Sequence, residues 1–351
     1  MQSVPNASFF DRVVASLFGG GRPRLDDQAD RQLIDDTIEA VVDMVEPRVR
    51  HNTRYRGKLE GCVRKTIAYL RAIARDPLEP VVLARAAWSE DPHLNAFFAT
   101  ADDVSLCVGR SREVRAFFED PSNAQVQEAY ALLGMKKEER TVFAPRLEGA
   151  TLQHGVAQVT VSFSEHRMIA PTATLAATRL EIGRRIVLRL AQVALSRIIA
   201  LDTKATELQE HKAFLGARIR LLNLARDGME GIVKDPATIG EERKALEREL
   251  KETVEDYIET KSSLATLDGY IGQIDDVFSH PEQHVTLTRT PVRISRMGYK
   301  VDEAATGPVN EVNLAELSIG ENLRGAIAIV RCLRSELPPK EDLVAKAERY
   351  L

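Results

Sequence analysis

Glu165, His166 and His154 are the best candidates for acid–base chemistry in this sequence. They flank the stretch 157–163, which alternates like a β-strand, so all three could cluster at one end of a hairpin. A carboxylate beside imidazole rings is a combination that transfers protons in general acid–base catalysis. The same residues also fit exposed loop positions, and we favour that interpretation. An enzyme with a site near His154 and His166 is therefore kept as a second alternative.

Other chemical motifs are missing from the sequence. It contains no glycine-rich phosphate loop, no nucleophile elbow and no zinc or calcium signature. Cys62, Cys107 and Cys332 are far apart, without the spacing of a metal site. His280 and His284 are separated by a proline, which disfavours a shared metal on one helix face. We therefore predict no catalytic residue, no metal and no cofactor, and we favour a protein that is not an enzyme.

A basic cluster lies between Arg48 and Arg75, where nine lysines and arginines accompany one acid, Glu60. Such a cluster can contact the phosphates of nucleic acid or an anionic membrane surface. Alternatively, it is a solvated helix face that nearby acids such as Glu39 and Asp43 neutralise. We favour neutralisation, because the whole chain has a net charge of −4. The candidate anion-binding residues are Arg48, Arg50, Arg54, Arg56, Arg64, Lys65 and Arg71.

Residues 1–23 form a separate segment, with an amphipathic stretch followed by the flexible joint Gly19–Gly21. Its apolar side chains recur at helical spacing, which suits docking in a partner's groove or on a membrane surface. Packing on the rest of the chain, or disorder, are the alternatives. The predicted partner-binding residues are Phe9, Phe10, Val13, Val14, Leu17 and Phe18.

Residues 171–280 carry the strongest pattern, a heptad repeat that predicts a long antiparallel coiled-coil hairpin. Asp235 and Pro236 interrupt it, and a turn centred there places Leu215 opposite Tyr257. The first arm is basic and the second acidic, which favours their pairing. A compact bundle is the alternative. The predicted seam residues are Leu201, Leu208, Leu215, Leu222, Leu250, Tyr257, Leu264 and Ile271.

The remaining segments complete a predominantly α-helical α+β fold. Residues 24–135 are punctuated by Asp–Pro pairs and are predicted to form a helical domain. Residues 136–170 and 281–333 alternate like strands and are predicted to form one small β domain, with the hairpin inserted between its two parts. Segment 325–331 fits a strand or a helix, and its β-branched side chains favour a strand. Residues 334–351 are predicted to form a C-terminal helix.

Composition excludes several classes of protein. Of the 351 residues, 44% are hydrophobic, which is ordinary for a globular protein. The most apolar stretch is too short for a membrane span, and the N-terminus does not resemble a signal peptide. The widely spaced cysteines suggest a reducing compartment. We therefore predict a cytoplasmic protein, with a peripheral position at the inner membrane as the alternative.

These observations favour a non-enzymatic coiled-coil interaction protein, a scaffold or adaptor that binds other proteins. The helical hairpin and the tethered N-terminal segment are both suited to holding other chains. The chain can also form a homo-oligomer through heptad surfaces outside the seam. Binding of nucleic acid or of an anionic membrane surface through the basic cluster is the first alternative.

Overall fold

A computed structural model describes residues 27–75, 78–148, 151–227, 236–301, 309–320 and 323–337. The protein is a mixed α+β structure with more helix than strand, which confirms the predicted class. Its contacts divide it into two compact units. The sheet unit comprises the described residues up to Asp36, those of Ile67–Val187 and those from Pro281 onward. The helical unit comprises Thr37–Thr66 and Leu188–His280.

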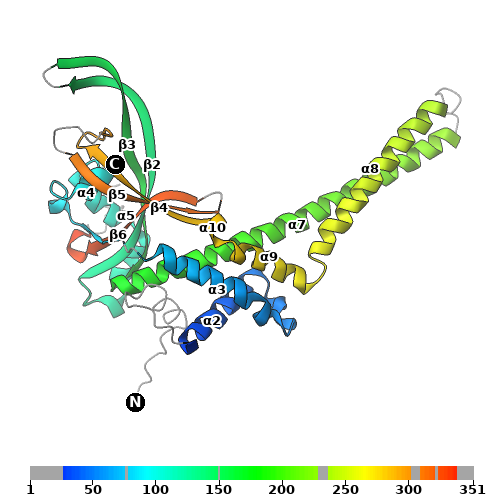
Figure 1. Ribbon diagram of the computed structural model, residues 1–351, viewed down its shortest axis with the longest axis horizontal. Helices are drawn as coiled ribbons and strands as arrows, with labels where there is room; N and C mark the ends of the chain where they lie inside the picture. Colours follow the sequence, from blue (N-terminus) through cyan, green and yellow to red (C-terminus); the bar gives the residue numbers. More distant parts are fainter. Residues whose placement is uncertain are drawn as a thin grey trace, which may run out of the picture. The chain divides into compact units, whose positions relative to one another are not determined.

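One sheet forms the centre of the sheet unit (Figure 1). Some of its strands precede the long helices in the sequence, and the others follow them. The strand order is β3-β2-β6-β5-β4. A further short strand, β1, pairs parallel with the second half of β6, whereas the other pairs are antiparallel. The strands are β1 (Val81–Leu83), β2 (Glu128–Glu148), β3 (Thr151–Thr172), β4 (Val285–Ser295), β5 (Val309–Ile319) and β6 (Leu323–Leu333).

Three short helices pack against one face of this sheet, and the sequence supplies a polar cap for each. Asp91 accepts hydrogen bonds from two backbone N–H groups of the first helix, and Thr100 forms a capping box with Asp103 at the second. Ser111 caps the third. The helices are α4 (Pro92–Phe97), α5 (Ala101–Arg110) and α6 (Arg112–Glu119).

Alternation along β6 distributes its side chains between the two faces of the sheet. Ala326, Ala328 and Val330 belong to the hydrophobic core shared with α4–α6. Ile327 and Ile329, at the positions between them, therefore face the opposite side. Both faces of β6 are apolar, as expected for a strand in the middle of a covered sheet.

The strands β2 and β3 are longer than their neighbours and continue as a two-stranded ribbon (Figure 1). Pairing of β2 with β6 ends at Met135, so the rest of β2 pairs only with β3. Beside the ribbon, Val161 N donates to Gly298 O and Lys300 N to Val159 O, both at 2.7 Å. These bonds join part of the outer edge of β3 to the turn after β4.

The helical unit is built from parts of α2 and α3, most of α7, and all of α8 and α9. The buried Thr66 hydroxyl donates to the carbonyl oxygen of Phe278 at 2.6 Å, which ties α3 to α9. The helices are α2 (Asp27–Val45), α3 (Tyr55–Ile73), α7 (Leu175–Asp227), α8 (Pro236–Ser263), α9 (Leu267–Ser279) and, in the sheet unit, α10 (Pro281–His284). The 3₁₀ turns are η1 (Pro47–His51), η2 (Arg85–Ala87), η3 (Pro121–Asn123) and η5 (Arg334–Glu336).

Helices α7 and α8 lie side by side and antiparallel, but in a different register from the predicted one (Figure 1). The prediction placed Tyr257 opposite Leu215, whereas the Tyr257 hydroxyl donates to Gln209 at 3.4 Å. His211 lies 3.2 Å from Glu249 in the same register. The prediction was wrong because Pro236 is the first residue of α8, where proline is tolerated, and not the centre of the turn.

A second difference from the predicted hairpin is a break in its second arm. The heptads predicted one continuous helix, but α8 ends at Ser263 and α9 begins at Leu267. Backbone hydrogen bonds of the break include the one from Gly269 N to Thr266 O at 3.0 Å. In α9, Asp276 forms an ion pair with Arg197 of α7.

The predicted helical domain 24–135 also needs correction. It contains β1, and β2 begins inside it at Glu128. Asp91–Pro92 marks the start of α4 and Asp120–Pro121 marks the start of the 3₁₀ turn η3, whereas Asp76–Pro77 lies outside the described residues. These pairs carry no information about the strands between them. Segment 325–331 is a strand, as favoured. Of the predicted helix 334–351, the described part is the 3₁₀ turn η5, and the rest lies outside the described residues.

Candidate functional site

Four large apolar side chains lie exposed on α7, and the three nearest its end, Phe214, Leu221 and Leu224, form what we call the outer stripe; the fourth is Ile199. The exposed fractions of the three stripe residues are 59%, 65% and 69%. Successive residues of a helix are ~100° apart, so these spacings place all three on one face. Leu215, which is only 1% exposed, lies on the opposite side of the helix from Leu224. Helix α7 is therefore apolar on two opposite faces, and only one of them is covered.

Basic side chains flank the outer stripe on both sides. Arg218 lies on one side, where it also forms an ion pair with Glu242 of α8 at 2.9 Å. Arg220 lies on the other side and is exposed. A partner that covers the stripe would therefore meet a guanidinium group at both of its margins, the one from Arg218 being shared with Glu242.

The predicted seam residues lie at buried or partly buried positions. Leu215 and Ile271 are buried, and the other six (Leu201, Leu208, Leu222, Leu250, Tyr257 and Leu264) are half-buried. Two buried positions of α8 are threonines, Thr253 and Thr260, which a search for apolar heptads does not find. The Thr253 hydroxyl donates to Glu249 O at 2.8 Å, so this buried hydroxyl group has a hydrogen-bond acceptor.

Sequence reasoning did not single out the outer stripe. The seam repeat accounts for one apolar face of this segment, and the heptad pattern makes no prediction for apolar residues outside that face. The signal is nevertheless present, because Phe214, Leu221 and Leu224 repeat at helical spacing out of phase with Leu215 and Leu222.

The basic cluster is extensively paired with acids, as the favoured interpretation predicted. Arg50 contacts both Glu39, at 3.0 Å, and Asp43, at 2.6 Å. Burial acts to raise the pKa of Glu39, but hydrogen bonds from Tyr55, Arg50 and Arg56 outweigh it and lower the pKa. Two further pairs are Arg48–Glu46 and Arg64–Glu60. Much of the charge that would attract a polyanion is thus compensated within the protein.

His166 does not form the acid–base group that the sequence suggested. Its Nε2 lies 2.8 Å from the carbonyl oxygen of Phe97, and its ring stacks on Phe98 with 4.5 Å between centroids. Glu165 contacts Lys136 and Arg167 instead. The side chain of the other predicted member, His154, is outside the described part of the structure.

His166 should make the stability of the protein depend on pH. Burial lowers the pKa of His166 below its usual value. The unfolded chain therefore binds a proton before the folded chain does, so stability is full above about pH 6.5 and falls as the pH drops toward the folded-state pKa. Urea denaturation at pH 7.5 and 5.5 measures this loss.

The variant for this measurement is His166→Phe, which keeps an aromatic ring against Phe98 and should reduce the difference between the two pH values. The matched control is Phe143→Leu, which changes an exposed aromatic side chain that does not titrate and should leave the difference unchanged. An unchanged pH dependence in His166→Phe would contradict the assignment.

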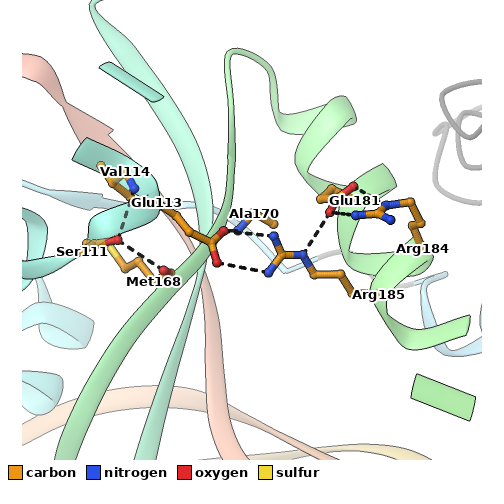
Figure 2. A network of polar contacts seen from close by, with 8 residues as sticks. All are labelled: Ser111, Glu113, Val114, Met168, Ala170, Glu181, Arg184 and Arg185. Carbon is orange, nitrogen blue, oxygen red and sulfur yellow. Dashed lines mark hydrogen bonds and ion pairs between the residues drawn. The ribbon is translucent and has the colours of Figure 1, made fainter. Parts of the chain in front are cut away.

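A network of charges ties the first turns of α7 to α6 and to the end of β3 (Figure 2). Arg185 bridges two carboxylates, with Nη2 at 2.9 Å from Glu113 Oε2 and Nε at 3.0 Å from Glu181 Oε1. Arg184 binds the second carboxylate through two nitrogens. Burial acts to raise the pKa of Glu181, but the hydrogen bonds from both arginines outweigh it and lower the pKa.

Glu113 also holds an unusual piece of backbone in this network (Figure 2). Ala170 has φ of 58°, in the left-handed region that disfavours side chains. Its N–H donates to Glu113 Oε2 at 2.9 Å. The network borders a cleft of about 540 Å³. Because its carboxylates and guanidinium groups already bind one another, we interpret it as a structural clamp.

Replacing Glu113 by alanine should therefore lower the free energy of unfolding by about 2 kcal/mol, because it removes an ion pair and leaves the Ala170 N–H without its acceptor. Glu113→Gln should cost less, since an amide oxygen can still accept from Ala170. Urea denaturation of the two variants measures the difference. Equal losses would show that Glu113 does not support the Ala170 backbone.

The remaining sequence predictions concern the N-terminal segment, metal binding and membrane spans. The proposed partner-binding side chains from Phe9 to Phe18 lie outside them. In the described ranges, no three His, Cys, Asp or Glu side chains are grouped so that they could hold a metal ion. None of the helices in those ranges is long and apolar enough to cross a lipid bilayer.

Comparisons of the chain with models of protein families, with curated proteins and with solved structures found no match.

Proposed function

We propose that this protein is a non-enzymatic interaction protein, a scaffold or adaptor, whose helical hairpin binds a helix of another protein along the outer stripe. The observation that carries the proposal is the exposure of Phe214, Leu221 and Leu224 on one face of α7. In this proposal α7 and α8 form an antiparallel coiled coil, and the partner helix adds a third strand to it.

The energetics support binding at this face. Burying one large apolar side chain contributes about 2 kcal/mol, so three of them together supply a substantial part of a micromolar affinity. Scattered exposed apolar residues are normal, but a row on one helix face is typical of a surface that is covered in an assembly.

Charge supports a particular kind of partner. Arg218 and Arg220 border the outer stripe, so the matching helix carries acidic residues on both sides of its own apolar row. Its apolar residues repeat every three or four positions, as in other helix-in-groove complexes. We place the interaction in the cytosol, where the three cysteines stay reduced; all three are free thiols.

The test begins with affinity capture from the native host on the full chain, followed by binding measurements with the purified partner. The variant Phe214→Ser/Leu221→Ser/Leu224→Ser should weaken binding at least ~100-fold. Circular dichroism should show unchanged helix content, because these side chains are exposed. Light scattering of the purified chain tests whether a second copy is the partner.

The matched control is Ile258→Ser, which removes another exposed side chain, 59% accessible, from α8. This control should bind like the natural chain. If the triple variant binds with unchanged affinity, the outer stripe is not the binding surface.

We also propose that the N-terminal segment supplies a second contact. Its support is the sequence pattern of Phe10, Val13 and Leu17 and the glycine joint that follows. In the same capture, Phe10→Asp/Leu17→Asp should reduce recovery of a partner that needs both contacts. Recovery that stays unchanged would assign binding to the hairpin alone.

A further inference from the structure

A small apolar cavity lies in the sheet unit, on the face of the sheet opposite α4–α6. Its volume is about 80 Å³, and it is bordered by the end of α3, the first turns of α7 and four strands. Of the thirteen described residues that line it, eleven are aliphatic and two, Arg179 and Arg289, are arginines. None of the thirteen is acidic, so the lining combines an apolar wall with positive charge.

Arg179 is the unusual member of this wall. Its Nη2 donates to the carbonyl oxygen of Leu78 at 3.3 Å, and its Nε is buried without a hydrogen-bond partner. Further along the same helix, Arg184 and Arg185 both bind carboxylates. In the described ranges Arg179 has no such ion pair, although a buried donor normally finds an acceptor.

We propose that this cavity binds the end of an aliphatic chain that carries one anionic head group, such as a carboxylate. The head group accepts hydrogen bonds from Arg179, and the chain contacts the aliphatic wall, for example Ile182 and Leu317. The ligand should be anionic, because the described residues that line the cavity include arginines and no acidic residue. Its apolar part follows from the aliphatic lining.

The size of the cavity limits the length of the bound chain. A cavity of ~150 Å³ accepts benzene, and this one is roughly half as large. It therefore holds only a few carbons, and a longer chain leaves part of its length outside. Affinity should rise with chain length while methylenes are being buried and then stop rising.

Isothermal titration calorimetry of the full chain with butyrate, hexanoate and octanoate tests this. Each buried methylene should raise the affinity about fourfold until the cavity is full. Hexanol and hexylammonium should bind at least tenfold more weakly than hexanoate, because neither offers an anion to Arg179. Absence of saturable binding for all three acids would overturn the proposal.

Two variants locate the site. Arg179→Met retains a long unbranched side chain but removes the charge. It should therefore abolish the preference for hexanoate over hexanol. Ala74→Leu adds volume at the cavity wall and should prevent binding. The matched control is Arg140→Met, which changes an exposed arginine and should bind like the natural chain. Unchanged binding in both cavity variants would show that the acids bind elsewhere.

The N-terminal segment of the same chain is the competing occupant. If hexanoate binds only to the full-length variant Phe10→Asp/Leu17→Asp, the cavity belongs to that segment and the ligand proposal is wrong. If the natural chain and this variant bind hexanoate equally, the cavity is available to a ligand and the proposal stands.

Discussion

Replacing Gly269 by alanine should lower the free energy of unfolding of the protein by about 3 kcal/mol. A Cβ atom at this position would lie 2.0 Å from the carbonyl oxygen of Ser263 and 2.9 Å from its carbonyl carbon. Both are backbone atoms, so no side-chain rotation relieves the contact. The start of α9 would have to move away from the end of α8. Urea denaturation followed by circular dichroism measures the loss.

Gly272, on the same helix, provides the matched control. Apart from the adjacent residues and the backbone of the helix itself, no atom lies within 4 Å of the place where its Cβ would be. Alanine is more favourable than glycine inside a helix by about 1 kcal/mol, so Gly272→Ala should stabilise the protein. The two substitutions are chemically identical and should act in opposite directions. Stabilisation by both would mean that the close approach at Gly269 does not exist.

Replacing Phe98 by alanine should cost about 4 kcal/mol, the largest effect that we expect from a single side chain. Phe98 is 2% exposed and belongs to the core between α4–α6 and the sheet. Its ring stacks on His166, so truncation opens a cavity and also exposes one face of the imidazole. Chemical denaturation at pH 7.5, where His166 is neutral, gives the loss directly.

The comparison for this variant is Phe143→Ala on the ribbon of β2 and β3. Phe143 is 77% exposed, so its removal should change the free energy of unfolding by less than about 0.5 kcal/mol. A loss comparable with that of Phe98→Ala would show that the ribbon is covered in solution, for example by a second chain.

Local patterns predicted the elements of this fold better than their relative positions. Alternation in Val285–Ser295 and the β-branched side chains of segment 325–331 identify strands, because strand geometry acts on neighbouring residues. Asp91 and Asp120 identify helix starts because a cap needs only one side chain and the N–H groups that follow it. These features depend on a few adjacent residues.

The register of α7 and α8 depends on single residues. The heptad repeat does not predict the effect of such residues on the register. Pro236 fits either a turn or the first residue of a helix, and the choice moves every contact of α8 along α7. The break before α9 uses three residues that look compatible with a continuing heptad. The outer stripe could be found in the sequence, but the pairing of Arg185 with Glu113 could not, because it joins α7 to a distant helix.

The order of the strands also determines when the protein can fold. Strand β6 lies in the middle of the sheet, between β2 and β5, yet it comes last in sequence among the described strands. The ion pair of Glu128 with Arg331 joins residues that are 203 positions apart. Contacts this distant form slowly, because a long loop must close first. During synthesis on the ribosome, the edge of β2 that pairs with β6 stays unpaired until β6 has emerged. A nascent or truncated chain therefore exposes a strand edge that can join another chain, and chaperones would be needed most at this stage.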